Sequence, residues 1–154
     1  MSLKYKEGLT AAQVGHDRSM ALRTKAHWFG VALNAPDPQE LGRFYERLLG
    51  WKIYADEPNW VTLAPSEDAG YNLSFQREER YVRPVWPAEE DKQQMQLHLD
   101  LEVDDLDQAV AYAIDAGAEL AAYQPQDTVR VMLDPAGHPF CLYIEESAAQ
   151  SDDG

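Results

Sequence analysis

The stretch Asp37–Gly50, DPQELGRFYERLLG, decides the fold. Asp37 is a favoured N-cap residue, and Pro38 suits the first helical position, where its missing N–H is not needed. Gly50 stands where a left-handed residue commonly ends a helix. Between them, apolar side chains recur at the spacing of one helical face, at Leu41, Phe44, Tyr45, Leu48 and Leu49. The stretch therefore predicts an amphipathic helix with one buried face.

Strand-like runs surround this helix. One run precedes it at Trp28–Ala35, and three follow it at Trp51–Ala55, Trp60–Ala64 and Tyr71–Gln76. The runs contain many of the aromatic and β-branched residues that favour strands, and turn-forming residues separate the last three. We therefore predict that residues 28–76 form a strand, a helix and three strands, which is a βαβββ module.

The same order returns in the second half of the chain. A strand-like run at Gln96–Val103 precedes a helix that Asp104 or Asp105 caps and Gly117 ends. Three further runs follow, of which the first is weak, at Glu119–Ala122, Thr128–Leu133 and Pro139–Ile144. The second half is therefore predicted to repeat the βαβββ order of the first.

Spacing supports an internal repeat. Leu33 and Leu101 lie 68 residues apart, and Gly50 and Gly117 lie 67 apart. Repeated segments of constant spacing indicate repeated structural units. We predict one domain at 27–146, composed of module one at 28–76, a connector at 77–95 and module two at 96–145. An N-terminal arm at 1–26 and an acidic tail at 147–154 flank it.

Charge and composition exclude several classes of function. The chain has 154 residues and a formal net charge of −14, which repels phosphate backbones and argues against nucleic-acid binding. No apolar run has the length needed to cross a bilayer, so we expect no membrane association. Met1–Gly8 lacks the apolar stretch of a secretory signal, and Cys141 is the single cysteine. We therefore expect a cytoplasmic protein.

Three segments resemble the vicinal-oxygen-chelate superfamily, which includes glyoxalase I, extradiol dioxygenases, and bleomycin- and fosfomycin-resistance proteins. They are Asp37–Gly50, His98–Asp107 (HLDLEVDDLD) and Asp134–Leu142 (DPAGHPFCL), and the glyoxalase-like domain branch is the most similar. The resemblance implies an α+β fold in which two βαβββ modules form a cupped, incomplete-barrel mixed sheet with helices on the outside. It also implies a homodimer, since this superfamily commonly pairs its modules edge to edge.

The cup is predicted to hold a small-molecule ligand. Alternate residues of a strand point to opposite faces, so we assign Val129, Val131 and Leu133 to the face under the helices and their neighbours to the cup. The predicted ligand-binding residues are Asn34, Trp60, Asn72, Ser74, Gln76, His98, Asp100, Arg130, Met132, Cys141 and Tyr143. An apolar hollow with a few fixed polar groups is typical of small-molecule sites. In the alternative, Asp100 and Arg130 pair across a closed cup.

The resemblance also implies where a metal would bind. The four ligand positions of metal-dependent members correspond to Gly30, Ser74, His98 and Cys141, of which only His98 is a usual ligand for such a site. We therefore predict no metal and no cofactor. Three alternatives stay open: a ligand set of His98, Asp100 and Cys141, a nucleophilic pair of Cys141 and His98, and His98 as a metal-free acid or base. His138 is interpreted as a surface turn residue.

These features predict a glyoxalase-like protein that binds a small molecule without a catalytic metal. The first alternative is an enzyme of the lyase/isomerase or dioxygenase type that uses an altered metal site or His98. The second is an interaction module whose cup is filled by its own side chains. The sequence specifies neither the ligand nor whether the two modules close one cup within a chain or exchange with a partner chain.

Overall fold

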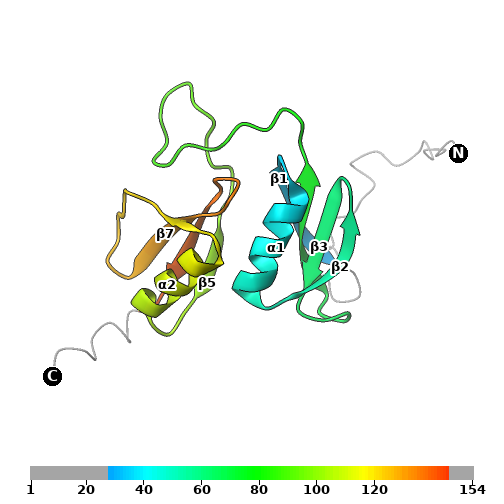
Figure 1. Ribbon diagram of the computed structural model, residues 1–154. Coiled ribbons are helices and arrows are strands. Elements are labelled where there is room, and N and C mark those ends of the chain that lie inside the picture. The colour runs from blue at the N-terminus through cyan, green and yellow to red at the C-terminus, as the bar shows by residue number, and fades with distance from the viewer. Residues whose placement is uncertain (1–27, 146–154) are drawn as a thin grey trace, which may run out of the picture.

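The computed structural model describes residues 28–145, and the predicted arm at 1–26 and tail at 147–154 lie outside this range. The described chain forms two βαβββ modules that a long connector joins (Figure 1). The predicted α+β fold of two such modules is confirmed. Within residues 28–145 no helix has the length and apolar character needed to span a membrane.

Module one contains β1 (Phe29–Ala35), α1 (Pro38–Leu49), β2 (Lys52–Glu57), β3 (Trp60–Ala64) and β4 (Tyr71–Arg77). Its sheet has the strand order β1-β4-β3-β2, with β1 parallel to β4 and the other pairs antiparallel. The Asp37 carboxylate accepts hydrogen bonds from the backbone N–H groups of Gln39 and Glu40, each at 3.1 Å. Gly50 ends α1 with a φ of 66°. The sequence signals for both ends of this helix are confirmed.

Module two repeats the topology with β5 (Leu99–Glu102), α2 (Leu106–Ala116), β6 (Glu119–Leu120), β7 (Val129–Leu133) and β8 (Pro139–Tyr143). Its strand order, β5-β8-β7-β6, is equivalent to that of module one. The Asp105 carboxylate caps α2 through the N–H of Gln108, at 2.8 Å. The weak strand signal near Glu119 corresponds to β6, which has only two residues.

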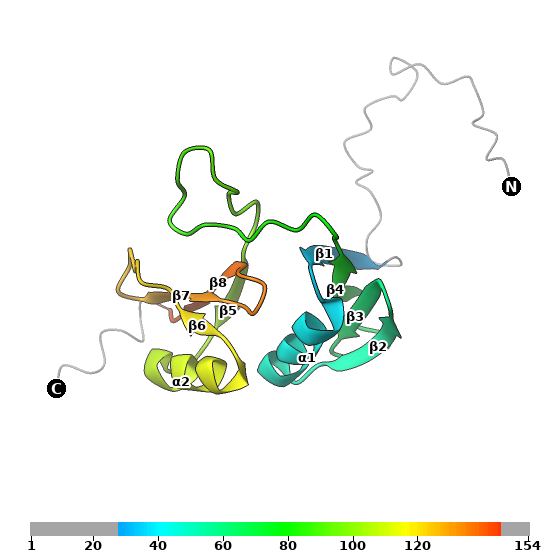
Figure 2. The ribbon, with the colours of Figure 1, turned by 45° about the horizontal axis from the view of Figure 1, so that its top comes forward.

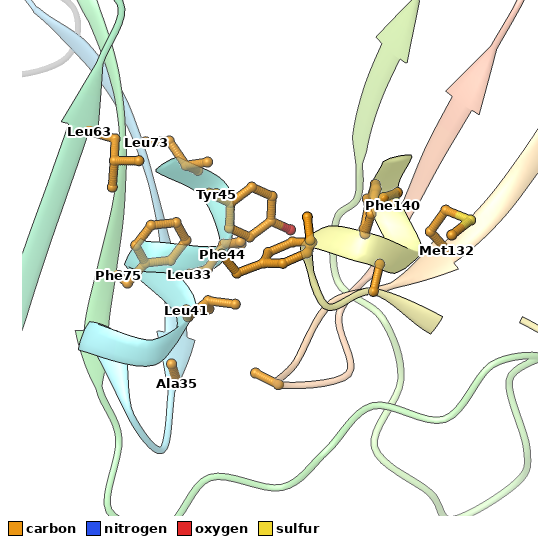
Figure 3. Close-up of a cluster of buried hydrophobic side chains, with 14 of the residues drawn as sticks. Leu33, Ala35, Leu41, Phe44, Tyr45, Leu63, Leu73, Phe75, Met132 and Phe140 are labelled. Atoms are coloured by element: carbon orange, nitrogen blue, oxygen red, sulfur yellow. The ribbon is translucent and has the colours of Figure 1, made fainter. Parts of the chain in front are cut away.

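The two modules share one core, and the helices lie within it. Phe44 and Tyr45 of α1 stand between Phe75 of β4 and Phe140 of β8 (Figure 3). The ring centroids of Tyr45 and Phe75 are 5.3 Å apart, and those of Phe44 and Phe140 are 6.0 Å apart. Helices α1 and α2 lie side by side (Figure 2). Each sheet therefore turns its helix-covered face toward the shared core and its open face away from it.

Because of this packing, the two sheets do not close one cup within the chain. Among the described elements, no strand of module one lies beside a strand of module two. Helix α1 packs on module two through α2 and through Phe140 of β8. Strands β1 and β5 each lie at the edge of their sheet with one side unpaired. The sequence left open whether the two modules close one cup within a chain. In the structure each chain has two separate open faces.

A buried carboxylate connects the modules across this core. The Tyr45 hydroxyl of module one donates a hydrogen bond to Asp134 of module two, at 2.9 Å. Asp134 also accepts from the backbone N–H groups of Ala136 and His138, at 2.9 and 3.0 Å. The His138 Nδ1 atom lies 2.8 Å from the same carboxylate, and only 14% of the His138 side chain is exposed. The interpretation of His138 as a surface turn residue was wrong, because the buried carboxylate draws its ring inward.

Candidate functional site

The open face of sheet one carries the side chains that alternation predicted. In the strand register, Gly30 stands opposite Asn72, Asn34 opposite Gln76, and Trp60 also opposite Gln76. Residues opposite each other in a sheet project from the same face. Sheet one therefore brings five predicted site residues together on one face, namely Asn34, Trp60, Asn72, Ser74 and Gln76.

Three of the polar groups on this face are bonded to one another. The Trp60 Nε1–H donates to the Thr62 hydroxyl at 2.7 Å, and the Thr62 and Ser74 hydroxyls lie 2.8 Å apart. Ser74 itself is buried. These groups hold the floor of the face in place, so Ser74 has little capacity left to bind a ligand directly.

Sheet one has a hollow of about 240 Å³ on this face, lined by Trp28, Tyr54, Thr62, Ala64, Glu67 and Asn72. Trp28 and Tyr54 are 50% and 42% exposed. Neither aromatic residue is among the predicted site residues. Trp28 lies two residues before Gly30 and therefore shares its face, so the alternation of strand residues could have identified it. Tyr54 follows Ile53, which packs against the core, so alternation along β2 also places Tyr54 on the open face.

The open face of sheet two holds a second group of predicted residues. Asp100 of β5 stands opposite Cys141 of β8, and His98 and Tyr143 lie two residues from these along their strands. A hollow of about 350 Å³ opens here, lined by His98, Asp100, Gln126, Thr128, Val129, Cys141, Tyr143 and Ile144. The structure thus keeps the predicted residues of the two modules on two separate open faces.

The predicted faces of β7 were wrong. Val131 pairs with Cys141 on the open face, whereas Met132 pairs with Phe140 and lies fully buried in the shared core. Arg130 pairs with Leu142, so it shares the core-side face of the strand. Residues 131–133 are all apolar, so alternation could not identify the buried face, and pairing with β8 determines it. Arg130 and Met132 therefore do not line the predicted cup.

Arg130 does not form the ion pair with Asp100 that the alternative prediction required. Its Nη1 atom donates to the backbone carbonyls of Asp127 and Val129, at 2.8 and 2.9 Å. Asp100 instead lies 3.2 Å from the Nε2 atom of His98. An ion pair between Arg130 and Asp100 does not close the face.

His98, Asp100 and Cys141 form a compact polar cluster. The ligand atoms of the three residues all lie within 4.8 Å of one another. Burial raises the pKa of the Cys141 thiol to about 11, and the charge and hydrogen bonding of Asp100 add to this effect. The thiol is therefore protonated near neutral pH, and a protonated thiol is a weak nucleophile. The geometry thus favours His98, paired with a carboxylate, over Cys141 as the reactive group.

The four family metal positions do not fit a metal. Gly30 offers no donor, and the space where a side chain would begin is taken by the amide of Asn72. The Ser74 hydroxyl is bonded to Thr62, and the Cys141 thiol has its pKa raised. Only His98 has the donor chemistry of an open octahedral site. We therefore derive no chemistry from a metal at these positions.

Cys141 is expected to react slowly in the folded protein. Its raised pKa predicts that alkylation by iodoacetamide at pH 8 is at least about 10-fold slower in the native protein than in urea, and that the native rate rises toward pH 11. Because the folded pKa is raised, the stabilising effect of the protonated thiol is present below the unfolded pKa and is lost as the pH rises through 11.

The substitution Asp100→Asn is the control for this prediction. It removes the carboxylate charge, so the native alkylation curve should move to lower pH. Equal native and unfolded rates at pH 8 would contradict the assigned environment of the thiol.

The fold is that of an α+β protein of paired βαβββ modules, each with one open sheet face. The chain belongs to the family described as Glyoxalase-like domain, whose sequence model matches residues 30–143. No curated protein matches the chain.

Solved structures share this fold at low sequence identity. One is a glyoxalase/bleomycin resistance protein/dioxygenase family enzyme from Burkholderia phytofirmans, which is 21% identical with a TM-score of 0.56; the match covers 75% of this chain and 95% of that one. A glyoxalase-related enzyme from Fulvimarina pelagi is 17% identical with a TM-score of 0.55, over 75% and 86% of the two chains. A glyoxalase family protein from Enterococcus faecalis is 21% identical with a TM-score of 0.54, over 74% and 94%.

Proposed function

We propose that the protein binds a small molecule in a cup made by sheet one of one chain and sheet two of a second chain. The observation that carries this proposal is the orientation of the two open faces, which point away from the shared core in each chain. A symmetric dimer would pair each face with its complement and create two equivalent cups. The Glyoxalase-like domain family, to which the chain belongs, supports small-molecule binding as the function.

The size of each hollow supports a shared site. The hollows on sheets one and two measure about 240 and 350 Å³. Sites for drug-sized ligands range from about 300 to 1,000 Å³ and bury most of the ligand surface. The hollow on sheet one alone is therefore below the lower limit and that on sheet two is only slightly above it, whereas the two together fall well within the range.

The free edges of the sheets support the same assembly. Strands β1 and β5 each expose one row of backbone N–H and C=O groups, which can pair with a strand of another chain. Phe29, in β1, is 62% exposed. A groove of about 610 Å³ follows the β5 edge, with apolar side chains such as Leu101, Val103 and Leu142 in its wall. We propose that β1 of the second copy occupies this edge, with its aromatic end covered.

Mixing two binding-deficient variants tests the shared cup. The ligand is first identified by a thermal-shift screen of small molecules. Trp60→Ala should then abolish binding through sheet one, and His98→Ala through sheet two. In a heterodimer of the two variants one cup carries both changes and the other carries neither, so subunit exchange should restore binding in about a quarter of the cups. Light scattering should report a dimer for every variant.

The outcome separates the two arrangements. If each chain makes its own site, mixing restores no binding at any ratio. A monomer at high micromolar concentration would also contradict the proposal.

We further propose that binding requires no catalytic metal and that the protein acts in the cytoplasm. Elemental analysis of the purified protein should find far less than one equivalent of Ni, Zn, Fe or Mn per chain, because the chain offers one good ligand at the four family positions. The protein should also fail to isomerise the hemithioacetal of methylglyoxal and glutathione. One metal per chain that is lost in His98→Ala would favour the enzyme alternative. If a bound ligand is converted without metal, the His98–Asp100 pair is the proposed acid–base group.

A further inference from the structure

The hollow on sheet one has two aromatic walls and a floor of small side chains. Trp28 lies at the β1 side and Tyr54 on β2, the opposite edge strand of the sheet. Between them, the floor is formed by Thr62, Ala64 and Asn72 on the two central strands. Three strand spacings of about 4.8 Å separate the edge strands, or roughly 14 Å. This span leaves room for a flat ring system between the two aromatic side chains.

Few hydrogen-bonding groups on this floor remain available. The Thr62 hydroxyl already accepts from Trp60 and is bonded to Ser74, so it presents mainly its methyl group. Ala64 is apolar, which leaves the Asn72 amide as the one side-chain amide in the lining. A ligand here would be held mostly by stacking and apolar contact, which favours an aromatic ring over a sugar-like or highly hydroxylated molecule.

The charge around the hollow is negative. Among the described residues that line it, Glu67 is the only charged one, and it is exposed at the rim. Lys52 pairs with Ala64 but is exposed and does not line the hollow. In the proposed dimer, sheet two of the second chain adds the carboxylates of Asp100 and Glu102 on the opposite side of the cup. A cation over aromatic faces and beside a carboxylate is favoured electrostatically.

We propose that this hollow binds a planar aromatic cation, with its rings between Trp28 and Tyr54 and its positive charge toward Glu67. This inference rests on the proposed function, because it specifies the ligand class of the same cup. Stacking on the aromatic walls provides most of the affinity, and Glu67 provides the preference for positive charge.

Three probes that differ in charge or in aromatic character test the ligand class. They are proflavine, a planar tricyclic cation; 2-anthracenecarboxylate, a planar tricyclic anion; and cyclohexylammonium, a cation without an aromatic ring. Binding of the two aromatic probes is followed by fluorescence anisotropy, and that of cyclohexylammonium by competition with proflavine. Proflavine should bind at least about 10-fold more tightly than either of the others. Equal affinity for the aromatic anion, or for the non-aromatic cation, overturns the proposal.

Variants of exposed residues separate the two contributions. Trp28→Ala should weaken proflavine binding by about 10-fold or more, whereas Trp28→Phe should retain most of it. Glu67→Gln should weaken proflavine by several-fold and leave 2-anthracenecarboxylate unchanged or bound more tightly. Asp68→Asn makes the same change in net charge at the neighbouring residue outside the lining, and should have little effect. Equal losses in Glu67→Gln and Asp68→Asn would mean a general charge effect and overturn the assignment to Glu67.

The same measurements distinguish this inference from the shared cup. Proflavine binding that depends on Trp28 and Glu67 but is unaffected by His98→Ala and not restored by mixing supports the aromatic hollow and contradicts the shared cup. Ligands that depend on His98 and Trp60 and are insensitive to Trp28→Ala and Glu67→Gln support the cup and overturn the present proposal.

Discussion

Replacing Asp134 with alanine is expected to lower the free energy of unfolding by about 3–5 kcal/mol. The carboxylate is buried and accepts hydrogen bonds from the Tyr45 hydroxyl and from the N–H groups of Ala136 and His138. Burial, with Asp134 nearby, raises the pKa of Tyr45 well above its ordinary value, so its hydroxyl stays protonated and needs an acceptor. The substitution leaves several buried donors without partners, and each costs about 1–3 kcal/mol.

Urea unfolding, followed by circular dichroism and tryptophan fluorescence, measures this loss. Tyr45→Phe is the matched control, because it removes the donor and leaves Asp134 its other partners; about 1–2 kcal/mol is expected. The double variant should lose less stability than the sum of the losses in the two single variants, because it no longer contains the Tyr45 hydroxyl that Asp134→Ala alone leaves without an acceptor. A loss below about 1 kcal/mol in Asp134→Ala would mean that water replaces the carboxylate and that the buried link contributes little.

Replacing Phe140 with alanine is expected to cost about 3–5 kcal/mol and to destabilise both modules together. Phe140 belongs to β8 of module two, yet its ring faces Phe44 and Tyr45 of module one across the shared core (Figure 3). Removal of the ring opens a cavity between the modules. The variant should therefore unfold in one transition at lower urea concentration.

Probes in both modules check this coupling. Tryptophan fluorescence reports mainly on module one, which contains Trp28, Trp51 and Trp60 of the four tryptophans, and Cys141 accessibility reports on module two. Both signals should change at the same urea concentration. Leu120→Ala, at an exposed apolar residue, should stay within about 0.5 kcal/mol of the wild type. All variants are compared at one protein concentration, because dimerisation stabilises the folded state. Two separated transitions in Phe140→Ala would show that the modules fold independently.

Local signals in the sequence predicted the elements of the fold well. The N-cap at Asp37 and the left-handed Gly50 specify the ends of α1 through contacts within a few residues. The repeat of this pattern predicted the second module and its βαβββ order of elements. On sheet one, strict alternation of apolar and polar residues also predicted the open face, because Leu73 and Phe75 alternate with Asn72 and Ser74.

The failures have physical reasons of a different kind. β7 is apolar on both faces, so only its hydrogen-bonded register with β8 places Met132 in the core. His138 is drawn inward by a carboxylate that sequence alone does not show to be buried. The relative placement of the two modules depends on contacts such as Tyr45 with Phe140, which no local pattern encodes.

The division of each strand into a core side and an open side has a consequence for how such a protein can diverge. Val61 and Phe75 pack in the interior, whereas their immediate neighbours Thr62 and Ser74 lie on the open face. The open-face residues of a strand can therefore be substituted to suit a different ligand, while the core-side residues between them keep the fold stable. A gene duplication that altered only these alternate positions would yield a paralogue with new selectivity and an unchanged scaffold. A solved structure that is only 21% identical to this chain shares its fold.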